Sequence, residues 1–157
     1  MNQFQQLNDL CVKKGMSIAT AESCTAGLLA SRITSVSGAS SFFKGGVISY
    51  QNDIKINILG VSQSTIKEKS EVCSEVVEQM ANGVRNKFSS DFAIATSGYA
   101  GPTGGSKSHP LGTIFFAISS NERTISKCII FTGDRERIIS QAVIEGVGLL
   151  IEELKNK

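Results

Sequence analysis

Ser23 stands where a short apolar run gives way to small polar residues and then to a helical pattern. The run 17–21 can enter a sheet, and helical spacing begins at Leu28. Backbone N–H groups at a helix start have no partner within the helix, so they can stabilise an oxyanion beside a hydroxyl nucleophile. Most such residues are helix caps, and this stretch alone favours a cap at Ser23 or Thr25 over a nucleophile.

A base for such a serine is scarce in this chain. The single histidine, His109, precedes Pro110 in a loop rich in Gly and Ser, so its default interpretation is an exposed loop residue, with a substrate contact as the alternative. Tyr50 ends a predicted strand, and Lys55 follows it on a short helix. A desolvated lysine can lose its proton and act as the base. Taken singly, a lysine on a short helix is more often solvated than catalytic, and a tyrosine at a strand end more often packs than reacts. Spacing in the sequence does not prove that either residue reaches Ser23.

The loop 97–106 is rich in glycine and follows a buried strand at its carboxyl end, where ligands of open α/β sheets bind. It does not match a P-loop, because Ser106 separates the last glycine from Lys107 and a strand follows instead of a helix. Its glycines allow backbone to approach a ligand and its N–H groups can form an anion nest, although a plain flexible loop fits as well. Arg135, at the start of the last helix, can hold a phosphate or carboxylate together with free N–H groups. A solvated arginine is the alternative.

Composition predicts one domain, 1–157, that binds neither nucleic acid nor membrane. The chain has 157 residues with 41% hydrophobic content, and its net charge of +2 is spread without a basic stripe. The four cysteines form no C-x-x-C pair and, with one histidine, offer no zinc ligand set, so we expect reduced thiols and no metal. No apolar run approaches the length of a membrane span, and the N-terminus lacks the basic and apolar regions of a signal peptide. We therefore expect a cytoplasmic protein.

Periodicity and turn signals predict a mixed α/β domain. We expect helices near residues 4–14, 28–36, 51–60, 75–88 and 138–154, and strands at 17–21, 42–50, 91–96, 112–118 and 124–131. The strand at 91–96 is apolar and bounded by turns, so it is predicted to be central. The last two strands form a predicted hairpin around Asn121, Gly45 and Gly46 indicate a bulge or a close backbone approach, and Ser74 is the expected cap of its helix.

Taken together, the ordered motifs of the chain resemble the CinA C-terminal domain family. They are AESCTAG at 21–27, GVISYQNDIK at 46–55, LGV at 59–61, SGYAGP at 97–102, PLGT at 110–113 and GDR at 133–135. Enzymatic members of this family are nicotinamide-nucleotide amidohydrolases, so the resemblance implies hydrolysis of the carboxamide of nicotinamide mononucleotide (NMN) to nicotinate mononucleotide and ammonia, without a cofactor. It also implies a three-layer α/β/α fold with a mixed, roughly five-stranded sheet, in a stand-alone form without the N-terminal molybdopterin-binding-like domain of longer members.

The resemblance further implies roles for single residues. Ser23 corresponds to the nucleophile, Lys55 to its base and Tyr50 to the tyrosine that accompanies them. N–H groups near Cys24 and Thr25 would stabilise the oxyanion, and Arg135 would hold the phosphate. The expected substrate-binding residues are Glu22, Cys24, Thr25, Gly98, Gly101, Gly104, Gly105, Thr113 and Arg135.

Three residues depart from the family pattern. Ala26 stands where a second glycine is usual, Cys73 where serine is usual and Ser97 where threonine is common. None of them removes the nucleophile or the base. We expect the methyl group of Ala26 to tighten or reshape the floor of the pocket.

Two other functions remain open at this level. One is a catalytically silent module that binds a nucleotide or a protein and is linked to competence or DNA-damage responses. Some members of such families keep the fold and lose the reaction. The other is an amidase for a different small carboxamide. Joint retention of Ser23, Tyr50 and Lys55 favours the NMN amidohydrolase. The expected partner is a small nucleotide, and a homo-oligomer is an expectation at the level of the family.

Overall fold

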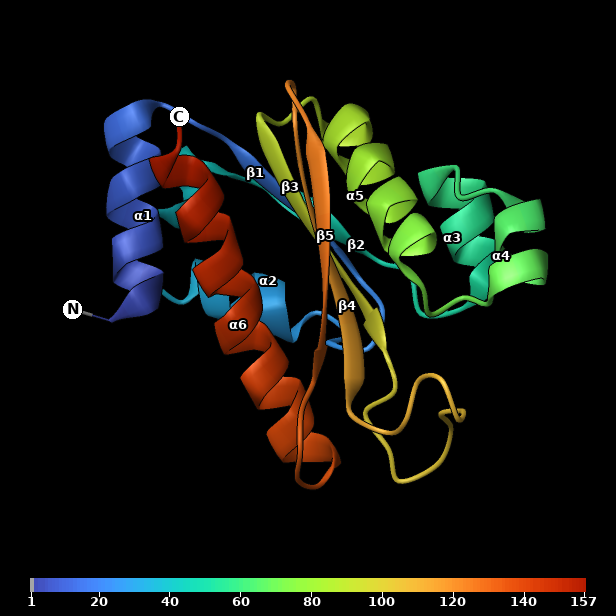
Figure 1. Cartoon of the computed structure of the whole chain (residues 1–157). Coiled ribbons are helices and arrows are strands. Elements are labelled where there is room, and N and C mark those ends of the chain that lie inside the picture. Colours follow the sequence, from blue (N-terminus) through green and yellow to red (C-terminus); the bar gives the residue numbers. More distant parts are fainter. Residues whose placement is uncertain (1) are drawn as a thin grey trace.

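A five-stranded sheet lies between two layers of helices in the computed structural model, which describes residues 2–157 (Figure 1). The strands are β1 (Ile18–Glu22), β2 (Phe43–Ile48), β3 (Phe92–Gly98), β4 (Thr113–Ser120) and β5 (Thr124–Ile130). One face is covered by α1 (Gln3–Lys14), α2 (Leu28–Thr34) and α6 (Arg135–Lys155), and the other by α3 (Asn52–Leu59), α4 (Gln63–Lys69) and α5 (Ser74–Phe88). A short 3-10 turn, η1 (Ala39–Ser41), precedes β2. The predicted three-layer α/β/α fold is confirmed.

The sheet is mixed, as predicted. Its strand order is β2-β1-β3-β4-β5, with β1 parallel to β2 and β3, while β4 is antiparallel to β3 and β5. β3 is central and buried from Phe92 to Ser97, because helices cover both of its faces. The three parallel strands end at the same edge of the sheet, so the loops that follow them are brought together there.

The glycine pair in β2 has both of the predicted features. The register between β1 and β2 shifts between Ile18 and Ala19, whose partners are Phe43 and Gly45. At Gly46, a Cβ atom would clash with the Thr20 hydroxyl. This close approach lets β2 pack against β1 just before the chain turns toward Tyr50.

All five predicted helices are present, with one cap misassigned. α1 and α3 end at Gly15 and Gly60, both in the left-handed region, which glycine adopts without strain. The prediction that Ser74 caps α5 is wrong, because Cys73 has the extended cap conformation and Ser74 is the first helical residue. α4 was not predicted, and none of its residues is buried, so it has no apolar stripe in the sequence.

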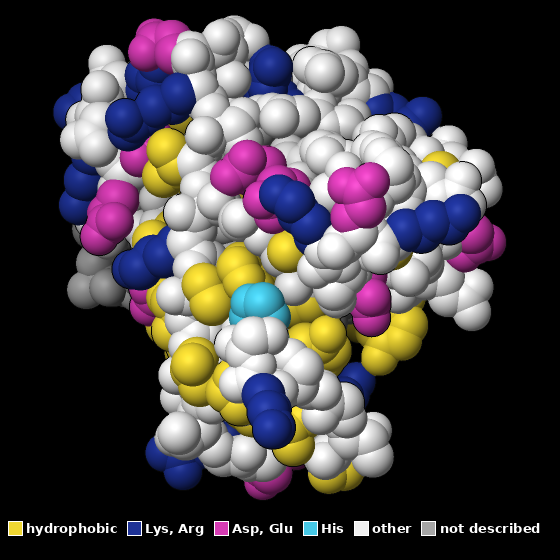
Figure 2. Space-filling model, turned by 45° about the vertical axis from the view of Figure 1, so that its right-hand side comes forward, with side chains coloured by type: hydrophobic (Ala, Val, Ile, Leu, Met, Phe, Trp, Pro, Cys, Tyr) yellow, Lys and Arg dark blue, Asp and Glu magenta, His cyan; other side chains and the backbone are white. Residues whose placement is uncertain are grey.

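Charged side chains of both signs are dispersed over the face shown in Figure 2, and the four cysteines are free thiols. Figure 2 shows side chains of both charges scattered over the face in view, without a continuous basic stripe. Cys11, Cys24 and Cys73 are buried free thiols, and Cys128 is an exposed one. Within residues 2–157, no helix combines the length and apolar content that a bilayer crossing requires.

Candidate active site

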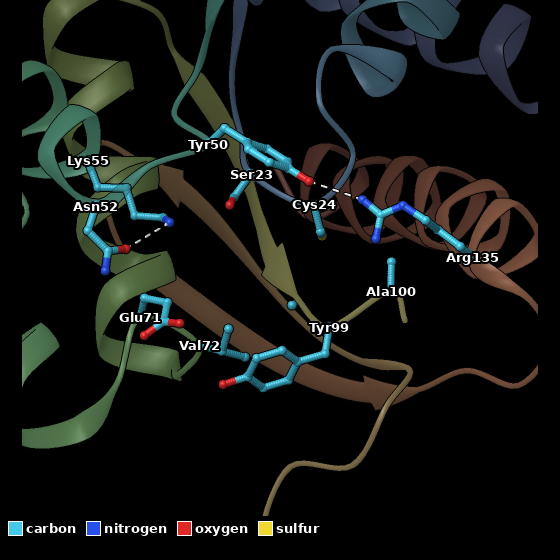
Figure 3. Close-up of a pocket in the computed structure, with 11 residues that line it drawn as sticks. Ser23, Cys24, Tyr50, Asn52, Lys55, Glu71, Val72, Tyr99, Ala100 and Arg135 are labelled. Carbon is cyan, nitrogen blue, oxygen red and sulfur yellow. Dashed lines mark hydrogen bonds between the residues drawn. The ribbon is translucent and has the colours of Figure 1, made fainter. Parts of the chain in front are cut away.

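A pocket of about 320 Å³ opens at the edge of the sheet where the parallel strands end. It is formed by the turn after β1, the β2–α3 connection, the α4–α5 loop, the segment after β3 and the first residue of α6 (Figure 3). Its lining residues are Ser23, Cys24, Tyr50, Asn52, Lys55, Glu71, Val72, Gly98, Tyr99, Ala100 and Arg135. The predicted nucleophile, base and tyrosine therefore share one cavity, although they come from three different segments.

Ser23 is the first residue after β1, and its backbone continues the pairing with β3. Its N–H donates to the Thr96 carbonyl over 3.0 Å, and its own carbonyl accepts from the N–H of Ala26 over 3.1 Å. The residue is 8% exposed, at the pocket. In the part of the chain that the structure describes, no hydrogen-bond partner is found for the N–H groups of Cys24 and Thr25. These two donors are free to serve an oxyanion formed at Ser23.

Glu22 is a structural anchor for this turn. The residue is 1% exposed, and its carboxylate accepts from the N–H groups of Gly27 (3.2 Å), Leu29 (2.8 Å) and Ala30 (3.1 Å). It also accepts from the Thr25 hydroxyl over 2.6 Å. The donors at the start of α2 are thus committed to Glu22, and the expectation that they serve Ser23 is wrong. The physical reason is that the helix begins only at Leu28, beyond the turn.

Lys55 is buried in α3, with 2% of its surface exposed. Burial lowers the pKa of its amine from the usual 10.5, and the nearby carboxylate of Glu71 opposes that shift. The amine donates one long hydrogen bond, 3.4 Å, to the Asn52 amide oxygen. Ser23 and Lys55 reach into the same part of the pocket (Figure 3), and among the described residues no hydrogen bond joins them. A buried amine with few partners is suited to exist as a neutral base.

Cys24 lies beside Ser23 but has different chemistry. Its thiol is buried, and burial raises its pKa to about 12. A thiol of this kind stays protonated at neutral pH and is a poor nucleophile. Cys24 is therefore not a pre-formed thiolate nucleophile at neutral pH.

Arg135 and Tyr50 form one wall of the pocket. Arg135 donates to the Gly101 carbonyl over 2.8 Å and to the Tyr50 hydroxyl over 3.0 Å, so its guanidinium is fixed while its other donors remain available. Tyr50 is 55% exposed, and its hydroxyl contacts Arg135. At the start of α6, Asp134 accepts from the Arg137 N–H over 2.9 Å. One of the backbone N–H groups that were expected to help Arg135 bind an anion is therefore already hydrogen-bonded within the chain.

Several residues expected to bind substrate lie outside the pocket lining. Gly98 lines it and Gly101 contacts it through Arg135, whereas Gly104 and Gly105 lie farther along the loop. Thr113 is buried and donates to the Pro110 carbonyl over 2.6 Å. Glu22 and Thr25 support the turn from behind instead of lining the cavity.

Ala26 and His109 are also separate from the pocket. Ala26 is exposed, and its φ of +46° is unusual for a residue other than glycine. The expectation that its methyl group shapes the pocket floor is wrong, because the residue does not line the cavity and its effect falls on the backbone. The His109 ring packs edge-on against Phe115 at 5.3 Å, half-buried in the loop. The default interpretation, an exposed loop residue, is only partly right for His109.

A model of the CinA C-terminal domain matches residues 2–154 of the chain. The chain belongs to this family. A CinA-like protein from Flavobacterium psychrophilum is 43% identical over 151 residues, which are 96% of this CinA domain and 36% of that protein. A CinA-like protein from Geotalea daltonii is 45% identical over 126 residues, 80% of this chain and 30% of the relative. The CinA domain thus spans about a third of the length of the curated relatives it matches.

Solved structures agree with this assignment. A CinA superfamily protein from Klebsiella pneumoniae superposes with a TM-score of 0.94 and 32% identity, over 100% of both chains. A competence/damage inducible protein from Agrobacterium tumefaciens gives a TM-score of 0.90 and 29% identity, over 99% of this chain and 97% of that one.

Five lining residues of the CinA domain were not singled out from the sequence. They are Asn52, Glu71, Val72, Tyr99 and Ala100. Asn52, Tyr99 and Ala100 lie inside motifs already quoted, so the motifs themselves carried that signal. Glu71 and Val72 lie in the loop between α4 and α5, and nothing in their local sequence connects them with Ser23 or Lys55.

Proposed function

We propose that this CinA domain hydrolyses the carboxamide of NMN, giving nicotinate mononucleotide and ammonia. The observation that carries the proposal is that Ser23 and the buried Lys55 open into one cavity, with Arg135 on its wall. The choice of substrate is supported by the resemblance of the ordered motifs to the amidohydrolases of the family to which the chain belongs. A cavity with a hydroxyl, a buried amine and a guanidinium suits a small molecule that has an amide at one end and a phosphate at the other.

In the proposed reaction, neutral Lys55 takes the proton of the Ser23 hydroxyl as its oxygen attacks the carboxamide carbon. The N–H groups of Cys24 and Thr25 stabilise the oxyanion of the tetrahedral intermediate. The Lys55 ammonium then gives its proton to the leaving nitrogen, which departs as ammonia and leaves an ester on Ser23. Water, deprotonated by Lys55, cleaves this ester, so nicotinate mononucleotide is released and both side chains are restored.

Tyr50 and Arg135 have supporting roles in this account. The guanidinium, held by Tyr50 and the Gly101 carbonyl, binds the phosphate and so sets the distance from the phosphate to the reacting amide. Tyr50 acts on the substrate through Arg135, so it is a positioning residue in this scheme. Truncation of Arg135 is expected to raise KM for the nucleotide far more than it lowers kcat.

The proposal is tested by ammonia release from NMN. The purified protein is compared with Ser23→Ala and Lys55→Ala, with Ser31→Ala, at an exposed serine of α2, as the matched control. We expect the rate of ammonia release to fall at least about a thousandfold in the first two variants and to stay close to that of the unmodified protein in the control. Ammonia release that Ser23→Ala leaves undiminished would exclude the covalent route.

Two further outcomes identify the alternatives. No ammonia from the unmodified protein, together with retained nucleotide binding, would favour the silent binding module. Release from a different carboxamide alone would favour an amidase of another specificity. Activity that persists with a chelator would agree with a reaction that needs no metal ion.

A further inference from the structure

Glu71 is the acidic side chain of the pocket. Among the described residues, the charged groups that line the cavity are Lys55, Glu71 and Arg135. The Glu71 carbonyl accepts from the Ser97 hydroxyl over 3.1 Å, so its backbone is tied to the end of β3. Figure 3 places the Glu71 carboxylate on the side of Asn52 and Lys55, with Arg135 across the cavity. The pocket therefore has an anionic side and a cationic side.

The anionic side lacks a fixed counterion. Among residues 2–157, Glu71 takes part in no ion pair, and its carboxylate accepts one long hydrogen bond, 3.3 Å, from the Ser70 hydroxyl. Lys55 is its only cationic neighbour among the lining residues on that side of the pocket, and Lys55 must be neutral to act as a base. In the reactive form of the site, the carboxylate is therefore free to attract a cation supplied by the ligand.

The proposed substrate carries such a cation. In NMN the ring nitrogen bonded to the ribose makes the ring a pyridinium, and the carboxamide is a direct substituent of that ring. With the carboxamide at Ser23 and the phosphate at Arg135, the ring lies inside the cavity that Glu71 lines. The Tyr99 ring also lines this cavity and offers an aromatic surface to a flat cation.

We infer that Glu71 recognises the positive charge of the pyridinium ring and so makes the site selective for the oxidised form of the nucleotide. This inference rests on the proposed function. The reduced nucleotide, with a neutral dihydropyridine ring, keeps the same carboxamide, ribose and phosphate. The two forms differ chiefly in the charge that Glu71 would sense, so they are matched probes of its role.

The test measures binding without turnover. In the Ser23→Ala protein, isothermal titration gives the dissociation constants of NMN and of its reduced form. We expect NMN to bind about fivefold more tightly, the scale of a charge pair open to solvent. Adding Glu71→Gln should remove most of this preference by weakening NMN alone, and leave only the part that the Tyr99 ring contributes. Adding Glu68→Gln instead, which removes the same charge from α4 outside the pocket lining, should leave the ratio unchanged.

Each outcome bears on one proposal or both. A ratio that Glu71→Gln leaves intact overturns the inference, even if the unmodified protein releases ammonia from NMN. A preference that Glu71→Gln largely removes, without ammonia release by the unmodified protein, supports the inference and overturns the proposed reaction. Failure to bind either form overturns the inference, and it overturns the proposed reaction as well when the unmodified protein releases no ammonia from NMN. Glu71→Asp, which keeps the charge, should retain part of the preference and separates charge from a folding defect.

Discussion

Replacing Glu22 by glutamine tests how the turn that carries Ser23 is held in place. One carboxylate oxygen, Oε1, accepts from the Thr25 hydroxyl and from the N–H groups of Gly27 and Leu29. The other, Oε2, accepts from the N–H of Ala30. Glutamine can keep the first oxygen in place, but its NH2 group then faces the Ala30 N–H, and two donors oppose each other.

The loss of stability caused by Glu22→Gln follows from these contacts. Loss of one hydrogen bond to a buried charged group costs about 1.5–3 kcal/mol. Removing the negative charge from the start of α2 adds about 0.5–1 kcal/mol, because the helix dipole favours an anion there. We therefore expect the free energy of unfolding to fall by about 3 kcal/mol, which lowers Tm by about 6–12 °C in a domain of this size.

Thermal unfolding followed by circular dichroism measures this effect. The matched control is Glu136→Gln, which removes the same charge from the first turn of α6, where the side chain is exposed. We expect the control to change stability by less than about 1 kcal/mol. Equal melting temperatures for the two variants would refute the claim that the Glu22 carboxylate anchors the turn.

Four further predictions concern the turn and the base. Ala26→Gly should stabilise the fold by about 0.5–1 kcal/mol, because the φ of +46° suits glycine; an unchanged or lower Tm would count against strain at this residue. Lys55→Met should abolish ammonia release but raise Tm by a few degrees, about 1 kcal/mol, since burial disfavours the ammonium. In the unmodified protein, kcat/KM should rise with pH as Lys55 loses its proton and level off below the 10.5 of an ordinary lysine; a rate independent of pH would exclude this base. Cys24→Ser should keep most activity, because the pKa of about 12 leaves the thiol protonated; inactivity with normal folding would assign chemistry to Cys24.

Strong apolar patterns account for the parts of the fold that the sequence predicts well. β3 and α6 bury many apolar residues, so periodicity predicts their types, and the apolar run of β3 also predicts its central position in the sheet. α4 has no buried residue, and its pattern therefore carries no signal. The cap of α5 was misplaced by one residue because Cys73, without a capping side-chain bond, takes the position expected for Ser74.

The sequence likewise predicts some residues of the site and misses others. Ser23, Tyr50 and Lys55 lie in motifs, and the edge shared by the parallel strands brings them together. The role of Glu22 depends on the hydrogen bonds that its carboxylate accepts from the start of α2, which local spacing does not reveal. Glu71 reaches the pocket because α5, which follows its loop, packs against α3, a tertiary arrangement without a local pattern.

The central claim is that Ser23 forms a covalent ester with the nucleotide. The direct measurement is intact-protein mass after the protein is mixed with NMN and quenched in acid within one turnover. The account predicts a transient adduct with the mass of nicotinate mononucleotide less water, located on Ser23 by peptide mapping and absent from Ser23→Ala. Steady ammonia release without any adduct, or an adduct that persists in Ser23→Ala, would contradict it.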